Sequence, residues 1–189
     1  QGALLLKDFG ADLYIADAVG VSLTRELSPL MVAIIVAGRS GSAFTAEIGS
    51  MKVSEEIDAL KTMGFNIHDF LVMPRIISMI ITLPVVVMFA DVIGILGGLV
   101  ASLGTLDITM TGYLNRLQVA VDFNDVLSGL IKAVIFGFVI TLIGCFRGMQ
   151  VSGGAESVGK YTTSSVVTSI FHIIFIDAVF TILFPILGI

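Results

Sequence analysis

The chain holds 189 residues, of which 56% are hydrophobic and 13% are charged, and its mean hydropathy is +1.04. Soluble domains hold about 45–50% apolar and about 25% charged residues, so these figures indicate an integral membrane protein and exclude a disordered tail or a coiled coil. The net charge of −5 argues against a nucleic-acid partner. The single cysteine, Cys145, excludes a disulfide framework and a cysteine-rich metal site.

An apolar but charged segment opens the chain. Residues 4–23 hold Lys7, Asp8, Asp12 and Asp17, which makes them too polar for a lone membrane span, so we predict a re-entrant or interfacial helix. The chain begins with Gln and lacks the pattern of a signal peptide. We therefore expect it to be part of a longer protein whose N-terminus is missing.

Four later stretches approach the roughly 20 mostly apolar residues that a membrane-spanning helix needs. They run from 28 to 48, 70 to 103, 126 to 146 and 166 to 187. The second is so long that it must tilt, bend at Pro84 or extend beyond the bilayer. The sequence predicts an all-α integral membrane protein: a polytopic helical bundle with about four to five membrane helices, in a single domain over 1–189.

The connection between the first two spans has the pattern of a short, capped, polar helix over 54–64. Ser54 suits the N-cap, acidic residues fill the first turn, and Gly64 suits the C′ position after the last turn. Such a helix lies on the membrane surface, docks into a partner or is a solvated connector. Its short apolar stripe comprises Ile57, Leu60 and Met63.

Basic residues are distributed unevenly among the loops. The loop around 104–125 carries only Arg116, whereas the loops around 49–75 and 147–160 carry five lysines and arginines. Positively charged loops stay in the cytoplasm, so we predict that the short polar helix and the 147–160 loop are cytoplasmic. The five basic residues are Lys52, Lys61, Arg75, Arg147 and Lys160.

Charged residues within or next to the spans are candidates for function, because a charge in the bilayer is costly. Arg25 and Glu26 open the first span, and Lys132 lies about 9 Å into the third, so we predict that Lys132 and Glu26 meet in the outer half of the bilayer. This acid–base group either holds an anionic or zwitterionic head group or only fixes helix packing. Asp91 and Asp177 either pair with hydroxyls or serve as proton sites.

Small residues recur every four positions along the first span. This spacing lets two helix backbones approach closely, either within the subunit or across a dimer. The residues that we assign to helix packing are Gly38, Gly41, Ser42, Thr45 and Gly49.

Residues 154–160 have the spacing of a phosphate-binding P-loop, but Tyr161 stands where the motif needs Ser or Thr. The two histidines, His68 and His172, lie far apart, so no catalytic triad or metal site is visible. We predict that the chain is not an enzyme, with no catalytic residues, no metal and no ATPase activity of its own.

Three segments together resemble the MlaE (YrbE-type) permease family. They are Arg25-Glu-Leu-Ser-Pro-Leu, Ala37-Gly-Arg-Ser-Gly-Ser-Ala-Phe-Thr-Ala-Glu-Ile-Gly and Glu56-Ile-Asp-Ala-Leu-Lys-Thr-Met-Gly. Residues 153–167 also match the last cytoplasmic loop and final helix of the family. Its members are membrane subunits of ABC transporters that move phospholipids and related lipids between bacterial membranes.

The resemblance implies a multi-pass protein of the bacterial inner membrane that forms a homodimer. The partners it implies are an ABC ATPase that binds ATP and Mg, a STAS-domain protein and a periplasmic MCE-domain protein, and the cargo it implies is phospholipid. It makes 54–64 the coupling helix, which docks into the ATPase through Glu55, Glu56, Asp58, Ala59, Leu60 and Lys61. Lipid contact in a cavity at the dimer interface falls to Arg25, Glu26 and Lys132.

An alternative class is an ion- or proton-coupled secondary transporter, in which an intramembrane carboxylate carries the coupled ion. The candidate carriers in this sequence are Glu47, Asp91 and Asp177. This alternative leaves the capped helix at 54–64 without a role, and dependence of transport on ATP separates the two classes.

Overall fold

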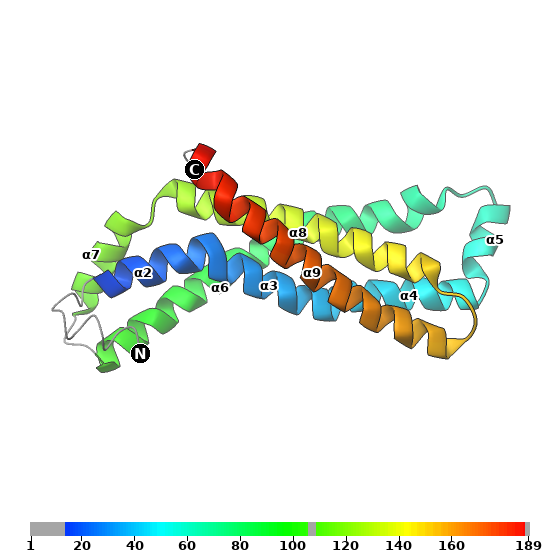
Figure 1. The fold of residues 1–189 in the computed structure, drawn as a ribbon, viewed down its shortest axis with the longest axis horizontal. Coiled ribbons are helices and arrows are strands. Elements are labelled where there is room, and N and C mark those ends of the chain that lie inside the picture. The colour runs from blue at the N-terminus through cyan, green and yellow to red at the C-terminus, as the bar shows by residue number, and fades with distance from the viewer. Residues whose placement is uncertain (1–13, 106–108, 188–189) are drawn as a thin grey trace.

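The computed structural model describes residues 14–105 and 109–187, which form an elongated bundle of helices (Figure 1). Four helical runs in the described residues are long and apolar enough to cross a membrane. The predicted fold class is therefore confirmed, and each run begins before its predicted stretch. The runs are Tyr14–Val53, His68–Gly104, Phe123–Gln150 and Ala155–Phe184.

The first run is one continuous helix built of five pieces. Its 40 residues span about 60 Å, roughly twice the hydrocarbon thickness of a bilayer. Two single-turn π segments, η1 and η2, interrupt it, and such segments recur at functional sites. The pieces are α2 (Tyr14–Ser22), η1 (Leu23–Leu27), α3 (Ser28–Val36), η2 (Ala37–Gly41) and α4 (Ser42–Val53).

Residues 14–22 of the segment predicted over 4–23 belong to the first run. Residues 14–22 form α2 and continue without a break into the span, so they are not a separate re-entrant or interfacial segment. Residues 4–13 lie outside the described residues. The charge of Asp17, which made a span implausible, is instead neutralised by Arg116 at 2.7 Å.

The short polar helix is α5 (Glu56–Thr62), and the prediction that it begins at Ser54 is wrong. Ser54 ends α4, because its hydroxyl donates to the backbone oxygen of Ser50 at 3.0 Å. The chain then reverses at Glu55, whose φ of 62° is left-handed. Of the acidic residues that the sequence pattern assigned to the first turn of α5, Glu56 and Asp58 lie there, whereas Glu55 is the N-cap.

The predicted end of this helix is confirmed. Gly64 has a φ of 84°, a conformation that glycine adopts at little cost. Its amide donates to Lys61 O at 2.9 Å, and the Phe65 amide donates to Leu60 O at 3.0 Å. This pair of bonds is a Schellman motif, which satisfies the last carbonyls of the helix.

The remaining helices run the length of the bundle or close its other end. α6 (Met73–Thr105) follows the π segment η3 (His68–Val72) and stays helical through Pro84. At 33 residues it spans about 50 Å, so it extends beyond the hydrocarbon layer or tilts within it. α8 (Phe123–Gln150) and α9 (Ala155–Leu187) complete the bundle.

A further helix, α7 (Met110–Ala120), occupies the segment that the sequence analysis left as a loop. Thr109 caps it by accepting from the Gly112 amide at 3.2 Å. Arg116 of α7 donates through two nitrogens to the Asp17 carboxylate of α2, so α7 and α2 lie side by side at one end of the bundle (Figure 1). We call this the α7 end, and the opposite end, with α5 and the α8–α9 connection, the α5 end.

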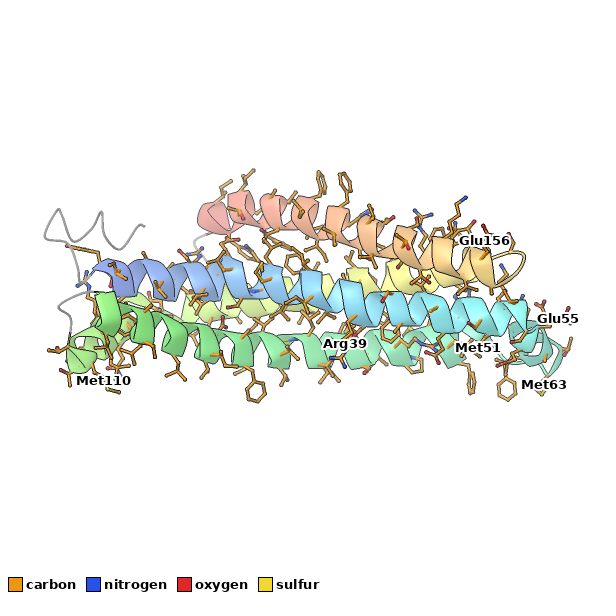
Figure 2. The ribbon with its side chains drawn as sticks, turned by 90° about the horizontal axis from the view of Figure 1, so that it is seen from below. Arg39, Met51, Glu55, Met63, Met110 and Glu156 are labelled. Carbon is orange, nitrogen blue, oxygen red and sulfur yellow. The ribbon has the colours of Figure 1, made fainter. Side chains whose placement is uncertain are left out.

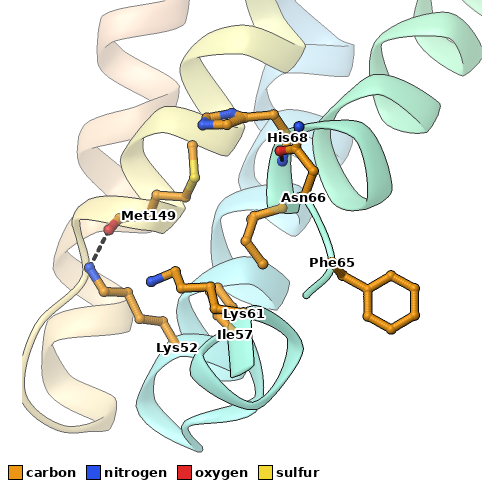
Figure 3. A pocket seen from close by; sticks show the side chains of 8 residues that line it. Lys52, Ile57, Lys61, Phe65, Asn66, His68 and Met149 are labelled. Carbon is orange, nitrogen blue, oxygen red and sulfur yellow. Dashed lines mark hydrogen bonds between the residues drawn. The ribbon is translucent and has the colours of Figure 1, made fainter. Parts of the chain in front are cut away.

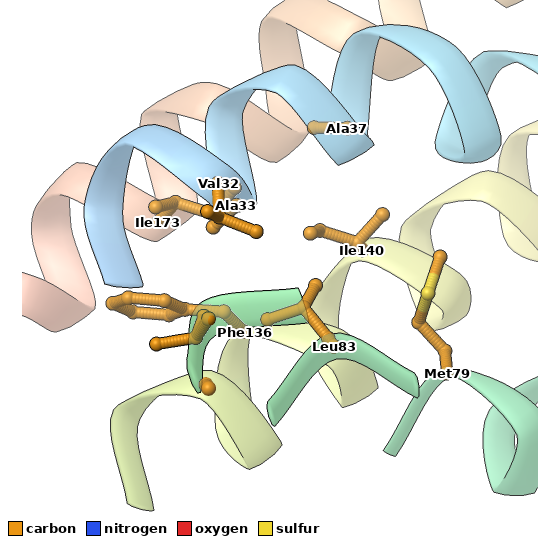
Figure 4. Packing of buried hydrophobic residues seen from close by; sticks show 10 residues of the cluster. Val32, Ala33, Ala37, Met79, Leu83, Phe136, Ile140 and Ile173 are labelled. Atoms are coloured by element: carbon orange, nitrogen blue, oxygen red, sulfur yellow. The ribbon is translucent and has the colours of Figure 1, made fainter. Parts of the chain in front are cut away.

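The buried apolar residues form three clusters along the bundle axis. The largest lies at mid-length, where side chains of α3, α6, α8 and α9 converge (Figure 4). The second lies beneath α5, and the third joins α2, α6 and α7. The central cluster comprises Val32, Ala33, Ala37, Met79, Leu83, Val87, Ala133, Phe136, Ile140 and Ile173.

Apolar side chains also cover the outside of the bundle. On α6, Ile93 and Val100 are 68% and 71% exposed, and on α9 Phe171 is 67% exposed. Side chains of this kind point outward along much of the molecule (Figure 2). A water-soluble chain does not present such a continuous apolar exterior, whereas lipid tails cover it at no cost.

We predict that Gly129→Ala destabilises the bundle. A Cβ atom at Gly129 would lie 2.1 Å from the backbone oxygen of Thr24, so α8 and the first run must separate. Overpacking of this kind costs about 1–3 kcal/mol. Thermal melting followed by circular dichroism in detergent measures the loss. Gly97→Ala is the control, because nothing lies within 4 Å of its Cβ position; equal melting of both variants would contradict the prediction.

Candidate functional site

A buried cluster of charges lies in the half of the bundle nearer the α7 end. Lys132 of α8 is fully buried, and its Nζ lies 2.5 Å from Glu26 Oε2 of η1 and 3.0 Å from Asp177 Oδ1 of α9. Three helical runs therefore meet on one ammonium group. The contact between Lys132 and Glu26 that the sequence predicts is present.

Two further groups complete the cluster. The Thr181 hydroxyl lies 3.3 Å and 3.4 Å from the two carboxylate oxygens of Glu26. The Phe184 ring lies with its centroid 5.9 Å from Lys132 Nζ, within range of a cation–π attraction. With two carboxylates around one ammonium, the cluster has a formal net charge of −1. The Glu26 side chain is its most accessible charge, at 36% exposure against 13% for Asp177 and 0% for Lys132.

Asp177 is a site residue that the sequence analysis did not place beside Lys132. The signal was available in the helix lengths, because Lys132 lies nine residues after the first residue of α8 and Asp177 ten residues before the last residue of α9. Two antiparallel helices of similar register bring such positions to the same depth.

Arg25 points elsewhere than its neighbour Glu26. Its guanidinium donates to Asp125 Oδ1 at 3.0 Å. The other oxygen of Asp125 accepts from the Asp122 amide at 2.9 Å, which makes part of a capping box at the start of α8. Arg25 therefore ties the first run to the N-terminus of α8, and Glu26 ties it to the same helix about two turns further along.

The small residues of the first span divide into two groups. Gly41 and Gly49 face Ile140 and Val151, and a Cβ atom added to either glycine would lie 3.0 Å or 2.8 Å, respectively, from a methyl group of that neighbour. Thr45 Oγ1 lies 3.0 Å from Gly144 O of α8 and 2.8 Å from Ser165 Oγ of α9. This group packs the helices within the chain.

The second group faces outward. Nothing lies within 4 Å of a Cβ at Gly38, and the Ser42 hydroxyl donates to the carbonyls of its own helix, to Gly38 O at 2.6 Å or Arg39 O at 2.9 Å. Arg39 between them is exposed, and it lies near the middle of the long axis (Figure 2). The face therefore presents small residues and one arginine side chain that bonds to none of the described residues.

The other intramembrane carboxylates have different surroundings. Glu47 pairs with Arg75 at 2.8 Å. Asp91 of α6 is 8% exposed, and its Oδ1 has no hydrogen-bond partner in the described part of the chain, although the side chain interacts with that of Ser28. Of the three candidate ion carriers, Glu47 and Asp177 thus have cationic partners among the described residues, and Asp91 does not.

The surface of α5 fits the predicted docking role in its distribution of polar and apolar residues. Ile57 is buried and Leu60 half-buried against the cluster beneath α5, which fixes the helix to the bundle. Asp58 accepts from Lys61 Nζ at 2.9 Å, and this ammonium holds the pKa of the Asp58 carboxyl below its ordinary value. Of the predicted docking residues, those that are exposed are Glu55, Glu56, Asp58, Ala59 and Lys61.

The exclusion of a nucleotide site at 154–160 agrees with the backbone. Residues from Ala155 onward belong to α9, so the segment is a helix rather than a loop that wraps around phosphates. Among the described residues, no group of three or more His, Cys, Asp or Glu side chains is placed to hold a metal ion.

The helices and the buried cluster together define a multi-pass helical membrane protein with charges in its interior. A family model described as permease MlaE matches residues 1–183. The chain belongs to the MlaE permease family, as the resemblance in three of its segments predicted.

Several relatives carry related names. A probable ABC transporter permease protein of Rickettsia typhi is 45% identical over 85% of this chain, which spans 62% of the length of that relative. One of Synechocystis is 42% identical over 87% of the chain and 63% of the relative. The chloroplastic protein trigalactosyldiacylglycerol 1 of Arabidopsis thaliana is 35% identical over 93% of the chain and 50% of the relative.

We predict that Lys132→Met destabilises the protein by about 3 kcal/mol, because it leaves the partly buried Glu26 and Asp177 carboxylates without their cation. Asp177→Asn costs less, since Lys132 keeps Glu26 as its partner. The triple variant with Lys132→Met, Glu26→Gln and Asp177→Asn recovers part of the loss. Melting temperatures of the purified variants test this order, and a Lys132→Met protein as stable as the parent would contradict it.

Proposed function

We propose that this chain is the membrane subunit of an ABC transporter that moves phospholipids between the inner and outer membranes of bacteria. The observation that carries the proposal is the buried cluster of Glu26, Lys132 and Asp177, held within a bundle whose exterior is apolar. Membrane proteins keep charges at such depth where they bind or move a polar group. The names of the relatives support the transporter class, and the plant relative, named after a diacylglycerol lipid, supports a lipid cargo.

In this proposal the polar head group lies against the cluster and the acyl chains lie against apolar walls. Glu26 is the charge most open to a ligand, and the net negative balance around Lys132 suits the ammonium of a zwitterionic head group. The lipid cavity lies between two copies of the chain.

A homodimer is supported by the outward face of the first span. Gly38 and Ser42 leave room for a second backbone, and the exposed Arg39 needs a polar partner at a depth where lipid offers none. A second copy of this chain supplies both the backbone that packs against Gly38 and Ser42 and the polar partner for Arg39. The periplasmic MCE-domain protein meets the dimer at the α7 end, and the ATPase and the STAS-domain protein meet it at the α5 end.

ATP hydrolysis in the partner drives the transport. The exposed face of α5 is the docking surface. The five predicted docking residues exposed there comprise three acidic residues, one alanine and one lysine. The five basic residues of the predicted cytoplasmic loops belong to α5 or to the parts of α4, α6, α8 and α9 nearest this end, which supports its cytoplasmic location under the positive-inside rule.

The ion-coupled carrier is the alternative, and it depends on Asp91, whose Oδ1 has no partner in the described residues. It predicts transport that follows an ion gradient without ATP. In reconstituted vesicles, an ATP requirement supports the ABC transporter and a gradient requirement supports the carrier.

We predict that Glu26→Gln lowers ATP-dependent lipid transfer about tenfold, the effect of losing one charge-assisted hydrogen bond. Asp177 still pairs with Lys132 in this variant, so the bundle keeps its fold. The measurement is transfer of a fluorescent phospholipid from vesicles that hold the full-length protein with its ATPase. Co-purification of the ATPase and a melting temperature well above that of the assay are the controls. Normal transfer by Glu26→Gln would remove the proposed head-group role.

We predict that Asp58→Ala weakens binding of the ATPase severalfold, because Asp58 is exposed on the outward face of α5 and orders Lys61 beside it. A pull-down of the ATPase with the detergent-solubilised full-length protein measures the loss. Glu156→Gln is the control, because it removes a carboxylate charge at the same end of the bundle but outside α5. Equal retention of the ATPase by both variants would exclude α5 as the docking surface.

A further inference from the structure

A pocket of about 370 Å³ lies between α5 and the ends of α4 and α8 (Figure 3). Lys52, Lys61 and His68 line it, and no carboxylate does so among the described residues. Ile57 and Met149 form apolar parts of its wall. The pocket lies where α5 meets the bundle, and of the residues assigned to the ATPase surface only Lys61 lines it.

The positive charge of this pocket is only partly neutralised. Lys52 Nζ donates to the backbone oxygen of Met149, a neutral acceptor. Lys61 pairs with Asp58 on the surface of α5, and the nearby Asp69 is bonded to Asn66 at 2.7 Å. The tips of Lys52 and Lys61 and the His68 ring surround the same space (Figure 3). The group is therefore a set of donors arranged around a cavity that no carboxylate of the described residues lines.

The depth of the pocket can be placed from the charges around it. Glu47 with Arg75, and Arg147 with Thr168, form a polar belt around the bundle. Lys52 lies five residues beyond Glu47, or about 8 Å along the helix. We place the edge of the hydrocarbon at this belt of polar pairs. Since the head-group layer is about 5–8 Å deep on each side of the hydrocarbon, Lys52 and the pocket then lie at the level of the lipid head groups.

Exposed apolar side chains lie beside the pocket. Phe65, which lines the pocket, is 48% exposed, and Phe70 is 53% exposed. Their ring centroids lie 5.3 Å apart, and Met63 at 63% exposure continues the apolar patch. Such a patch suits contact with acyl chains rather than with water.

We propose that this pocket binds the phosphate of an anionic lipid from the cytoplasmic leaflet, as a site separate from the transported cargo. The leaflet is rich in anionic lipids and favours each lysine near its surface by about 1 kcal/mol. The acyl chains lie beside Phe65 and Phe70, and the phosphate accepts hydrogen bonds from Lys52, Lys61 and His68. Such a lipid holds α5 against the bundle. The proposal depends on the membrane orientation and not on the identity of the cargo.

The test uses the absence of tryptophan from this chain. Phe65→Trp places a fluorophore at the pocket, and the quenching that it adds over the parent protein reports the neighbouring lipid. The full-length protein with its ATPase is reconstituted in phosphatidylcholine vesicles that contain either brominated phosphatidylglycerol or brominated phosphatidylcholine. We predict stronger quenching by phosphatidylglycerol. Lys52→Gln lowers this preference about fivefold. His68→Gln, on the opposite wall of the pocket, lowers it as well.

Lys160→Gln is the matched control, because Lys160 is a cytoplasmic lysine outside the pocket, and it keeps the preference. Equal quenching by the two lipids in the Phe65→Trp protein, or an equal loss in all three charge variants made in it, overturns the proposal. Inorganic phosphate distinguishes the source of the anion: displacement of phosphatidylglycerol at millimolar phosphate assigns the pocket to free phosphate instead. Because the readout needs no lipid transfer, its failure is separate from failure of the proposed transport.

Discussion

Burial of the Lys132 ammonium is the constraint on which the arrangement of the helices depends. A fully buried charge in a membrane protein needs opposite charges within contact distance, and Glu26 and Asp177 supply them from two other helical runs. A shift of either run by one residue would move its carboxylate about 1.5 Å along the axis and about 100° around it. The cluster thus fixes the register of the first run, α8 and α9 at once.

Close packing in the rest of the bundle follows from glycine and from hydroxyls that bond to backbone. Gly129, Gly137 and Gly144 of α8 each face a backbone oxygen of a neighbouring helix, which would lie 2.1 Å to 2.9 Å from a Cβ atom added at the glycine. α8 therefore accepts a neighbouring backbone at three levels. Thr45 joins α4 to α8 and α9 at one of them. Since lipid gives no hydrophobic drive for association between helices, this close approach supplies the attraction.

Local and periodic signals explain which features the sequence predicts. The four spans follow from hydropathy, the end of α5 from Gly64, and the meeting of Lys132 with Glu26 from counted depth. The prediction of where α5 begins is wrong, because a serine can either cap the helix that follows or end the helix before. Which of the two occurs here depends on the left-handed turn at Glu55. α7 and the ion pair of Arg116 with Asp17 depend on packing between segments 99 residues apart, which no local pattern contains.

The first run joins the two functional regions as one element. Glu26 of the buried cluster and Lys52 beside α5 belong to the same continuous helical run, 26 residues or about 39 Å apart. A π segment includes Glu26 itself, and a second one contains Gly38 and Arg39. Because π turns are where long helices bend, and because Gly38 leaves its outer side open, the first run could bend at η2 without a clash on that side. Thr45 bonds α4 to α8 and α9, so a displacement of α5 would reach the cluster through these two helices as well as through the bend.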